Sequence, residues 1–352
     1  MPGDTTTMAT LDRTSNPTPP PTADATMHSI IQRVYGSVPE DVLDHVEVPL
    51  PTIADDEVLV RVRAASVDRG TWHVMSGLPY AIRLAGFGVR RPKGPNPGRS
   101  VAGSVVSVGK LVTALEPGDD VYGVCDGGAF AEYAAADAAK LARKPANLTW
   151  QQAAAVPISG LTALQAVRDK ARVRAGQKVL VVGASGGVGT FAVQLAKAFG
   201  AEVTGVCSTA KVQLVASLGA DDVIDYTRVD FADKTRRWDT ILDIGGNRPL
   251  GHLRRALAPR GRLVIVGGQT DGKLLGGSDR QVRALLLSPF VGQTLGTLLS
   301  SENAADLDAL RELSEAGALA PVVDRTYSLA ETAAAVRYLL DGRAGGKVVI
   351  AV

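Results

Sequence analysis

Cysteine and histidine are scarce in this chain of 352 residues, which contains two cysteines, Cys125 and Cys207, and four histidines. Two cysteines cannot build a disulfide framework or a four-cysteine zinc site. No two histidines stand at metal-ligand spacing, so the sequence predicts no bound metal. The four histidines are His28, His45, His73 and His252.

Long apolar runs and an excess of one charge are also missing. No run of about 18 apolar residues occurs, which argues against a membrane-spanning helix. The richest stretch, residues 282–300, is interrupted by Arg283 and Pro289 and is expected to be buried core. The 38 basic and 36 acidic residues give a net charge of +2, without a block of like charge. We therefore expect neither a nucleic-acid partner nor a membrane partner.

The N-terminal 26 residues lack the features of a folded segment and of a targeting signal. They are rich in Thr and Pro without apolar periodicity, so residues 1–26 are expected to form a disordered tail. They have neither the basic start nor the apolar centre of a secretory signal, and their aspartates argue against a mitochondrial presequence. We therefore expect a cytoplasmic protein. The length predicts about two domains.

The most informative stretch is residues 178–200. Lys178-Val-Leu-Val-Val182 is typical of a strand buried on both faces of a parallel sheet. A glycine-rich turn follows, and residues 190–199 read as a helix that ends at Gly200. Free backbone N–H groups at such a helix N-terminus bind phosphate, so this turn predicts a dinucleotide site. The expected contact residues are Gly183, Ser185, Gly186, Gly187, Val188 and Gly189.

The remaining pattern predicts an α/β fold with two parts. Short strands at 57–63, 101–109 and 120–125 indicate a β-rich domain, and residues 151–171 are expected to be helical. Six strand candidates then alternate with helices, which predicts a doubly wound parallel sheet. They cover residues 178–182, 202–207, 222–226, 239–244, 262–266 and 291–299. A strand at 321–327, a helix at 330–340 and a strand at 345–352 are expected to return to the first domain.

Several motifs in this order resemble the medium-chain dehydrogenase/reductase superfamily, and in detail its zinc-free quinone oxidoreductase branch. They are Gly98-Arg-Ser-Val-Ala-Gly103, Pro117-Gly-Asp119, Gly128-Ala-Phe-Ala-Glu-Tyr133, Pro157-Ile-Ser-Gly-Leu-Thr-Ala163, the glycine-rich turn and Gly346-Lys-Val-Val-Ile350. The resemblance implies a GroES-like catalytic domain over 27–150 and 319–352, and a Rossmann domain over 151–318.

The tip of the second Rossmann strand favours NADPH over NADH. A ribose 2′-hydroxyl is usually held there by Asp or Glu, but this chain has Cys207-Ser-Thr-Ala-Lys211. The hydroxyls of Ser208 and Thr209 and the Lys211 cation suit a 2′-phosphate. A helix cap followed by a surface lysine is the alternative reading. The resemblance implies that Tyr226 lines the same phosphate pocket.

Four further cofactor contacts are expected. The resemblance implies that Thr162 packs under the nicotinamide, although helix packing alone would also explain a threonine there. Val266 and Gly267 follow the fifth strand at the carboxyl edge of the sheet, where ligands bind. Lys347 matches a family position near the cofactor phosphate, although a single lysine on a strand is more often solvated.

The resemblance also bears on the metal and on the reacting groups. The positions of the zinc ligands in related alcohol dehydrogenases fall on Asp68, Arg99 and the neighbourhood of Ser159, and arginine cannot ligate zinc. Two substrate-facing positions of the family fall on Asp68 and Trp72. Asp68 is either an acid or a turn cap, Trp72 can stack a flat ring, and His73 is either a proton donor or a solvated histidine.

We therefore expect an NADPH-dependent, zinc-independent oxidoreductase that transfers hydride to a quinone or an α,β-unsaturated carbonyl. A carbonyl-reducing alcohol dehydrogenase of the same fold and a cofactor-binding protein with little turnover remain alternatives. Residues 291–299 look like an apolar edge strand, and such edges usually need a partner, so we expect a homodimer.

Overall fold

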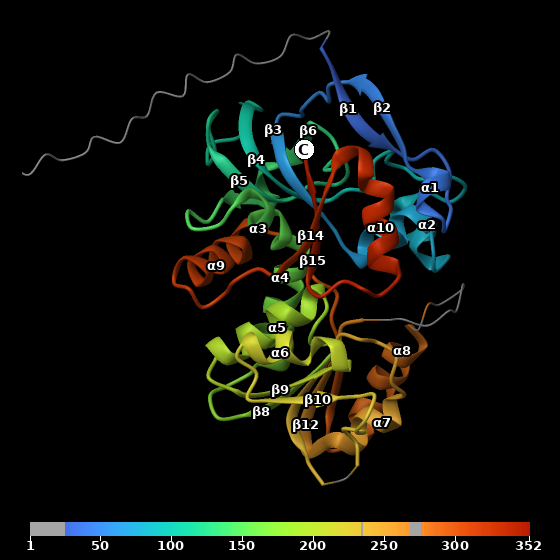
Figure 1. Ribbon diagram of the computed structural model, residues 1–352, viewed down its shortest axis with the longest axis vertical. Coiled ribbons are helices and arrows are strands. Elements are labelled where there is room, and N and C mark those ends of the chain that lie inside the picture. The colour runs from blue at the N-terminus through green and yellow to red at the C-terminus, as the bar shows by residue number, and fades with distance from the viewer. Residues whose placement is uncertain (1–24, 234, 268–275, 277) are drawn as a thin grey trace, which may run out of the picture.

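The computed structural model describes residues 25–233, 235–267, 276 and 278–352 (Figure 1). Of the tail expected over residues 1–26, residues 1–24 lie outside the described residues. Thr26 already belongs to a strand, β1 (Thr26–Ile31), which pairs with β2 (Asp44–Pro49) in a two-stranded antiparallel sheet. The described chain therefore enters its first sheet one residue before the expected start at Met27.

The second half of the chain builds the predicted doubly wound sheet. Its six strands are all parallel, in the order β10-β9-β8-β11-β12-β13. The strand order reverses beside β8, and the carboxyl ends of β8 and β11 open a crevice at this point. The strands are β8 (Lys178–Val182), β9 (Glu202–Cys207), β10 (Asp222–Asp225), β11 (Trp238–Asp243), β12 (Leu257–Ile265) and β13 (Thr294–Thr297).

A second sheet of seven strands forms the other half. Its path is β14-β15-β3-β4-β5-β7, with β6 paired to β3. The last strand, β15, pairs with β3, and β14 pairs with β15 on its outer side, as expected for a C-terminal segment that returns to the first domain. The strands are β3 (Glu57–Val67), β4 (Ser100–Val108), β5 (Asp120–Val124), β6 (Tyr133–Asp137), β7 (Leu141–Arg143), β14 (Val323–Ser328) and β15 (Lys347–Ala351).

The helix predicted over 151–171 is three consecutive segments: α3 (Trp150–Ala155), α4 (Pro157–Leu164) and the π-helical η3 (Gln165–Ala171). Proline cannot donate a backbone hydrogen bond inside a helix, so the break falls at Pro157. The other helices are α1 (Pro39–Val42), α2 (Arg69–Ser76), α5 (Gly187–Ala198), α6 (Val212–Ser217), α7 (Leu250–Ala256), α8 (Ser278–Leu287), α9 (Ala304–Glu315) and α10 (Thr332–Leu340). The short turns are η1 (Arg83–Phe87), η2 (Ala138–Lys140), η4 (Thr209–Lys211), η5 (Ser288–Phe290) and η6 (Leu329–Glu331).

One continuous core joins the two sheets. Helices α3 and α4 lie between them in Figure 1, and the apolar cluster there combines Tyr122 of β5 with Phe191 of α5 and Leu307 of α9. The Tyr122 hydroxyl donates a hydrogen bond of 2.6 Å to the carbonyl oxygen of Leu307. The two halves are therefore held in one arrangement, which fixes the walls of the crevice between them.

The expectation that residues 282–300 are buried core is wrong for most of this stretch. Ala284 of α8 and Leu295 of β13 are buried in one apolar cluster, but Leu286 is 68% exposed and Phe290 is 84% exposed. The cause is that α8 is amphipathic at the edge of the sheet, so only its inner face finds apolar neighbours. Among the described residues, no helix is long and apolar enough to cross a membrane.

Candidate functional site

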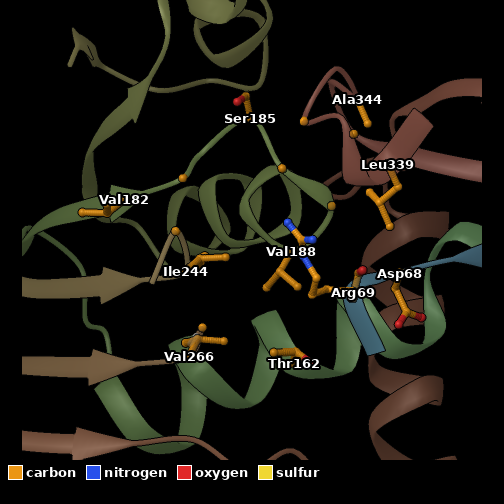
Figure 2. Close-up of a pocket in the computed structure, with 18 of the residues that line it drawn as sticks. Asp68, Arg69, Thr162, Val182, Ser185, Val188, Ile244, Val266, Leu339 and Ala344 are labelled. Carbon is orange, nitrogen blue, oxygen red and sulfur yellow. The ribbon is translucent and has the colours of Figure 1, made fainter. Parts of the chain in front are cut away.

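A cavity of about 590 Å³ occupies the crevice at the carboxyl edge of the parallel sheet. Figure 2 shows the glycine-rich turn after β8 on one side and the start of α2 on the other. The residues predicted from the sequence that line it are Asp68, His73, Thr162, Gly183, Ser185, Gly186, Gly187, Val188, Ser208, Lys211, Tyr226, Val266, Gly267 and Lys347. The structure thus gathers these widely separated residues in one cleft, without Trp72, Gly189 or Thr209.

The glycines of the turn serve different purposes. Gly183 has φ +85°, and a Cβ there would lie 2.8 Å from the backbone nitrogen of Gly245. A Cβ at Gly189 would lie 2.1 Å from the carbonyl oxygen of Gly183, so this position packs the helix against the turn. A Cβ at Gly186 would meet no described atom closer than 3.5 Å. The chain itself leaves room at Gly186, and the bare backbone facing the cleft there fits a closely approaching phosphate.

Asp68 has a structural role at the start of α2. Its Oδ1 accepts a hydrogen bond of 3.2 Å from the Thr71 amide, and the Thr71 hydroxyl accepts one from the Asp68 amide, which completes a capping box. Its Oδ2 is buried and has no hydrogen-bond partner among the described residues. The cap interpretation is therefore confirmed, and Asp68 is also among the residues that line the cleft.

His73 and Trp72 lie one residue apart on α2, with only His73 lining the cleft. The Nδ1 atom of His73 lies 2.7 Å from the carbonyl oxygen of Leu78, and because a carbonyl only accepts, Nδ1 carries the hydrogen. Burial lowers the pKa of His73 below its ordinary value, and the nearby Arg69 charge acts in the same direction. Trp72 instead packs against the apolar core of the first domain, away from the cleft.

Two cations face the glycine-rich turn. Lys347 is 2% exposed, its side chain lies against Gly187, and its Nζ has no hydrogen-bond partner among the described residues. Burial lowers the pKa of Lys347, and the charge of Asp68 opposes this shift. The alternative of a solvated lysine at position 347 is therefore wrong, and the predicted cofactor contact stays a prediction. Figure 2 shows the guanidinium of Arg69 directed into the cleft toward Val188. Both cations suit a bound phosphate.

The opposite end of the cleft contains Ser208, Lys211 and Tyr226, with Arg248 beside them. The Arg248 guanidinium lies 5.6 Å from the centre of the Tyr226 ring, within the range of a cation–π contact. The Lys211 ammonium donates a hydrogen bond of 3.2 Å to the Gly342 carbonyl oxygen. These residues form a polar, positively charged end of the cleft.

Thr209 does not line this end of the cleft, although the sequence predicted a phosphate contact there. Its hydroxyl donates a hydrogen bond of 2.5 Å to Asp225 and lies 3.0 Å from the hydroxyl of Thr227. Hydrogen bonds from the hydroxyls of Thr209 and then Thr227 to the Asp225 carboxylate lower the pKa of Asp225. The hydroxyl of Thr209 therefore joins two loops rather than facing a ligand.

The floor of the cleft is formed by Thr162 of α4 and by Val266 and Gly267 after β12. The Thr162 hydroxyl donates a hydrogen bond of 2.7 Å to the carbonyl oxygen of Ile158 in the preceding turn, so its methyl group is the part left to contact a ligand. Gly267 accepts a hydrogen bond of 3.2 Å from Arg280 of α8. The floor is thus apolar, and the hydrogen bond from Arg280 fixes the position of Gly267.

Sequence reasoning missed three arginines of the site: Arg69, Arg248 and Arg280. Arg69 follows Asp68 at the end of the long strand β3, and Arg248 follows Gly245-Gly246-Asn247 at the sheet edge. The available signal for Arg248 was a basic residue in the loop that follows β11 at the carboxyl edge of the parallel sheet, and the signal for Arg69 was its position beside Asp68. Arg280 had no such signal, because it acts from a helix on the far side of the loops.

The positions that correspond to zinc ligands are occupied differently here. Arg99 forms an ion pair of 2.9 Å with Glu302 and one of 3.5 Å with Asp126, and it is not among the residues that line the cleft. Burial raises the pKa of the nearby Cys125 thiol to about 11, which disfavours the thiolate that binds metals. In the described part of the chain, no group of three or more His, Cys, Asp and Glu side chains is placed to hold a metal ion.

Two family models match the chain. The model for the alcohol dehydrogenase GroES-like domain matches residues 54–146, and the model for zinc-binding dehydrogenase matches residues 218–350. The first match covers β3 to β7 of the seven-stranded sheet, and the second covers β10 to β13 of the parallel sheet and most of the C-terminal return to the first domain.

Curated and solved relatives cover nearly the whole chain. The chloroplast envelope quinone oxidoreductase homolog of Arabidopsis thaliana is 31% identical over 92% of this chain and 98% of its own length. The 2-methylene-furan-3-one reductase of Solanum lycopersicum is 35% identical over 90% of this chain and 76% of its own. The solved quinone oxidoreductase from Coxiella burnetii has a TM-score of 0.78 and 28% identity, covering 93% of this chain and 100% of its own.

The resemblance predicted from the motifs is thus confirmed by sequence and by fold. The chain belongs to the medium-chain dehydrogenase/reductase superfamily, in its quinone oxidoreductase branch, and is a pyridine-nucleotide-dependent oxidoreductase.

Proposed function

We propose that this protein uses NADPH, without zinc, to reduce a quinone or an α,β-unsaturated carbonyl. The observation that carries the proposal is the composition of the cleft: a glycine-rich turn flanked by Lys347 and Arg69 at one end, and an apolar floor at the other side. Relatives in the quinone oxidoreductase branch bear names that specify quinones or an activated alkene. At the zinc-ligand positions, Arg99 is engaged by carboxylates and cannot ligate a metal.

The residues present fit a dinucleotide. The amides of the turn, the Arg69 guanidinium and the buried Lys347 ammonium would hold the pyrophosphate, because each supplies a donor and two add positive charge. Lys211, Arg248 and Ser208 would hold a 2′-phosphate, with Tyr226 beside it. When bound, the reduced nicotinamide supplies the hydride. The chain's own task is then to orient the acceptor over Thr162 and Val266 and to exclude water.

Completing the reduction requires a proton at the substrate oxygen. His73 in its neutral form has its hydrogen on Nδ1, directed at Leu78, so Nε2 accepts rather than donates. We infer that His73 donates only as the imidazolium, which burial disfavours. Acceptors whose reduced form is already acidic, such as hydroquinones and enols, need less help from an acid than simple alcohols do. This favours quinones and enones over aldehydes and ketones.

The direct test is steady-state oxidation of NADPH with a panel of one quinone, one enal and one simple aldehyde. We expect quinone and enal turnover at least about tenfold above aldehyde turnover, because only the aldehyde requires strong acid or metal assistance. Treatment with a strong chelator should leave the rate unchanged. Preferential aldehyde reduction lost on chelation would support the alcohol dehydrogenase alternative, and tight NADPH binding without turnover would support the low-turnover alternative.

Cofactor preference has its own test at the positively charged end of the cleft. We expect Lys211→Ala and Arg248→Ala each to weaken NADPH binding by about tenfold, with little effect on NADH, because only NADPH has a 2′-phosphate. The control is Lys110→Ala, which removes an exposed lysine paired with Asp55. Equal dissociation constants of the unmodified protein for NADH and NADPH would overturn the preference.

We also propose a homodimer through the outer edge of the parallel sheet. The edge strand β13 and the exposed side chains Leu286 and Phe290 form an apolar face that favours association with a second copy. Sedimentation analysis should give a dimer, and Leu286→Asp with Phe290→Asp should give a monomer. A monomer of the unmodified chain at high concentration would contradict this assignment.

The cytoplasm is our proposed compartment. Both cysteines are free and buried, which agrees with a reducing environment. Cell fractionation tests this proposal.

A further inference from the structure

The charge of this chain is unevenly distributed in its first domain. Residues 69–115 contain no Asp or Glu, although the whole chain has nearly equal numbers of basic and acidic residues. The same stretch contains seven basic residues. They are Arg69, Arg83, Arg90, Arg91, Lys93, Arg99 and Lys110. Three of the seven lie within four positions of each other at the end of one exposed loop, residues 78–93, which we call the rim loop.

Hydrogen bonds to neighbouring residues hold the backbone of the rim loop in a defined conformation. The Tyr35 hydroxyl lies 2.7 Å from the Phe87 carbonyl oxygen and 2.6 Å from that of Gly88, and it donates to this pair. The Arg83 side chain donates a hydrogen bond of 2.9 Å from Nε to the Gly77 carbonyl oxygen, and its guanidinium lies 4.3 Å from the centre of the Tyr35 ring. The Lys93 amide donates to Phe87 at 2.8 Å. The backbone is thus held in place from within the protein.

Although it is anchored, the rim loop presents apolar side chains to solvent. Leu84 is 80% exposed, Val89 is 62% exposed and Tyr80 is 45% exposed. Arg90, Arg91 and Lys93 are exposed beside them, and none of the three takes part in an ion pair among the described residues. Apolar and cationic side chains on one ordered loop are the combination found in segments that bind a membrane surface.

The rim loop starts at the wall of the cleft. Its first residue, Leu78, accepts the hydrogen bond from His73, which lines the cavity. On the other side, Pro79 lies against Gly276, which precedes α8 of the Rossmann half: a Cβ at Gly276 would be 2.9 Å from the Pro79 side chain. The rim loop therefore lies at the junction of the two halves, beside the part of the cleft that His73 lines.

We propose that the rim loop docks the protein on an anionic lipid surface, from which it takes a lipophilic quinone. The substrate part of this inference rests on the proposed quinone reductase function. Leu84 and Val89 would enter the region between the head groups and the acyl chains, and Arg90, Arg91 and Lys93 would contact lipid phosphates. The earlier expectation of no membrane partner rested on whole-chain charge, which hides this local excess.

Two other occupants fit less well. A nucleic acid would use the cations but would leave Leu84 and Val89 in water. A second copy of the chain, docked through the same loop, would bring the two sets of cations together without acidic partners. Exposed apolar side chains flanked by cations match a surface that is itself apolar beneath an anionic layer.

Vesicle flotation of the full chain tests docking without any turnover. We expect binding to vesicles of phosphatidylcholine mixed with phosphatidylglycerol, at least about tenfold weaker binding to phosphatidylcholine alone, and release by added salt. Arg90→Glu with Arg91→Glu, and separately Leu84→Ser with Val89→Ser, should each reduce binding about tenfold or more. The matched control is Lys110→Glu with Leu111→Ser, because Leu111 is an exposed apolar residue outside the rim loop.

Turnover assays with two kinds of quinone are the second part of the test. With a water-soluble quinone the rim-loop variants should equal the unmodified protein, since none of the four positions lines the cleft. With a long-chain quinone embedded in anionic vesicles they should be slower by about the factor lost in binding. Equal binding to both vesicle types, variants that bind as well as the control, or preferential capture of RNA would each overturn the docking proposal. Absence of quinone turnover in every assay would overturn the proposed function while the flotation result still decides docking.

Discussion

Arg280 of α8 and Asp243 at the end of β11 form an ion pair of 2.8 Å in the interior, where the two side chains are 9% and 0% exposed. The same guanidinium donates to the carbonyl oxygen of Gly267 at 3.2 Å and to that of Arg248. One side chain therefore ties together the loops after β11 and β12, which form the edge of the cleft. Burial raises the pKa of Asp243, and the Arg280 charge opposes this shift.

Arg280→Met should therefore destabilise the protein and weaken cofactor binding together. Removing the guanidinium leaves a buried carboxylate without its partner, which costs about 3–5 kcal/mol of the free energy of unfolding. Urea unfolding and NADPH titration measure the two effects. The control is Arg283→Met on the same helix, because its ion pair with Asp279 is exposed and contributes at most about 1 kcal/mol. Equal behaviour of the two variants would contradict the bracing role.

His73 should make stability depend on pH in a predictable direction. Burial lowers its pKa in the folded state below the ordinary value of 6.5, so the folded state binds the proton less tightly than the unfolded state. Its contribution to stability is present above pH 6.5 and is lost as pH falls through the folded pKa. His73→Gln should flatten the dependence of the unfolding free energy between pH 7.5 and 5. A variant that keeps the full slope would assign it to other groups.

The rate of quinone reduction should depend on pH in the opposite direction to the stability contribution of His73. If the imidazolium donates the proton, quinone reduction by the unmodified protein should decline as pH rises through the lowered pKa, and His73→Gln should remove this decline. The pH profile of kcat in the two proteins measures it. Identical profiles would show that another group, or water, supplies the proton.

Lys347→Met should separate stability from cofactor binding. Burial lowers the pKa of Lys347, so its charge costs stability at neutral pH, and the apolar variant should be more stable by about 1 kcal/mol or more. NADPH affinity should nevertheless fall at least about tenfold, because a charged hydrogen bond to phosphate is lost. The matched control is Lys178→Met, which changes an exposed lysine at the start of β8. Reduced stability with unchanged affinity would contradict the assigned role.

The parallel half of the fold could be predicted from the sequence because its signals are local. The apolar run of residues 178–182 before the glycine-rich turn predicted β8, and the alternation of strand and helix patterns after it predicted the rest of the parallel sheet. Pro157 was a signal for a break in this helix, but the helical pattern on both sides of it led to the prediction of one continuous helix. The exposure of Leu286 and Phe290 was not predictable, because an apolar composition does not reveal which face finds a neighbour.

The site was predictable where backbone chemistry defines it and less so where side-chain direction does. The glycine-rich turn carried its own spacing, so its predicted contact residues line the cleft, except Gly189, which packs the helix against the turn. Trp72 and Thr209 were placed by their neighbours in sequence, but Trp72 turns into the core and Thr209 turns toward Asp225. The rings of Trp72 and His73 contact each other edge to face with centres 5.0 Å apart, but only His73 lines the cleft, a difference in side-chain direction that the sequence does not reveal.

The dissociation constant of NADPH for the Gly186→Val variant tests the proposed cofactor site most directly. A side chain at Gly186 meets no described atom closer than 3.5 Å, so this variant should fold normally, whereas its side chain should occupy the place of the pyrophosphate. The control is Gly251→Val on α7, where a Cβ meets nothing within 4 Å. We predict that Gly186→Val binds NADPH at least about 100-fold more weakly, while Gly251→Val binds as the unmodified protein does. A folded Gly186→Val variant with unchanged affinity would show that the cofactor lies elsewhere.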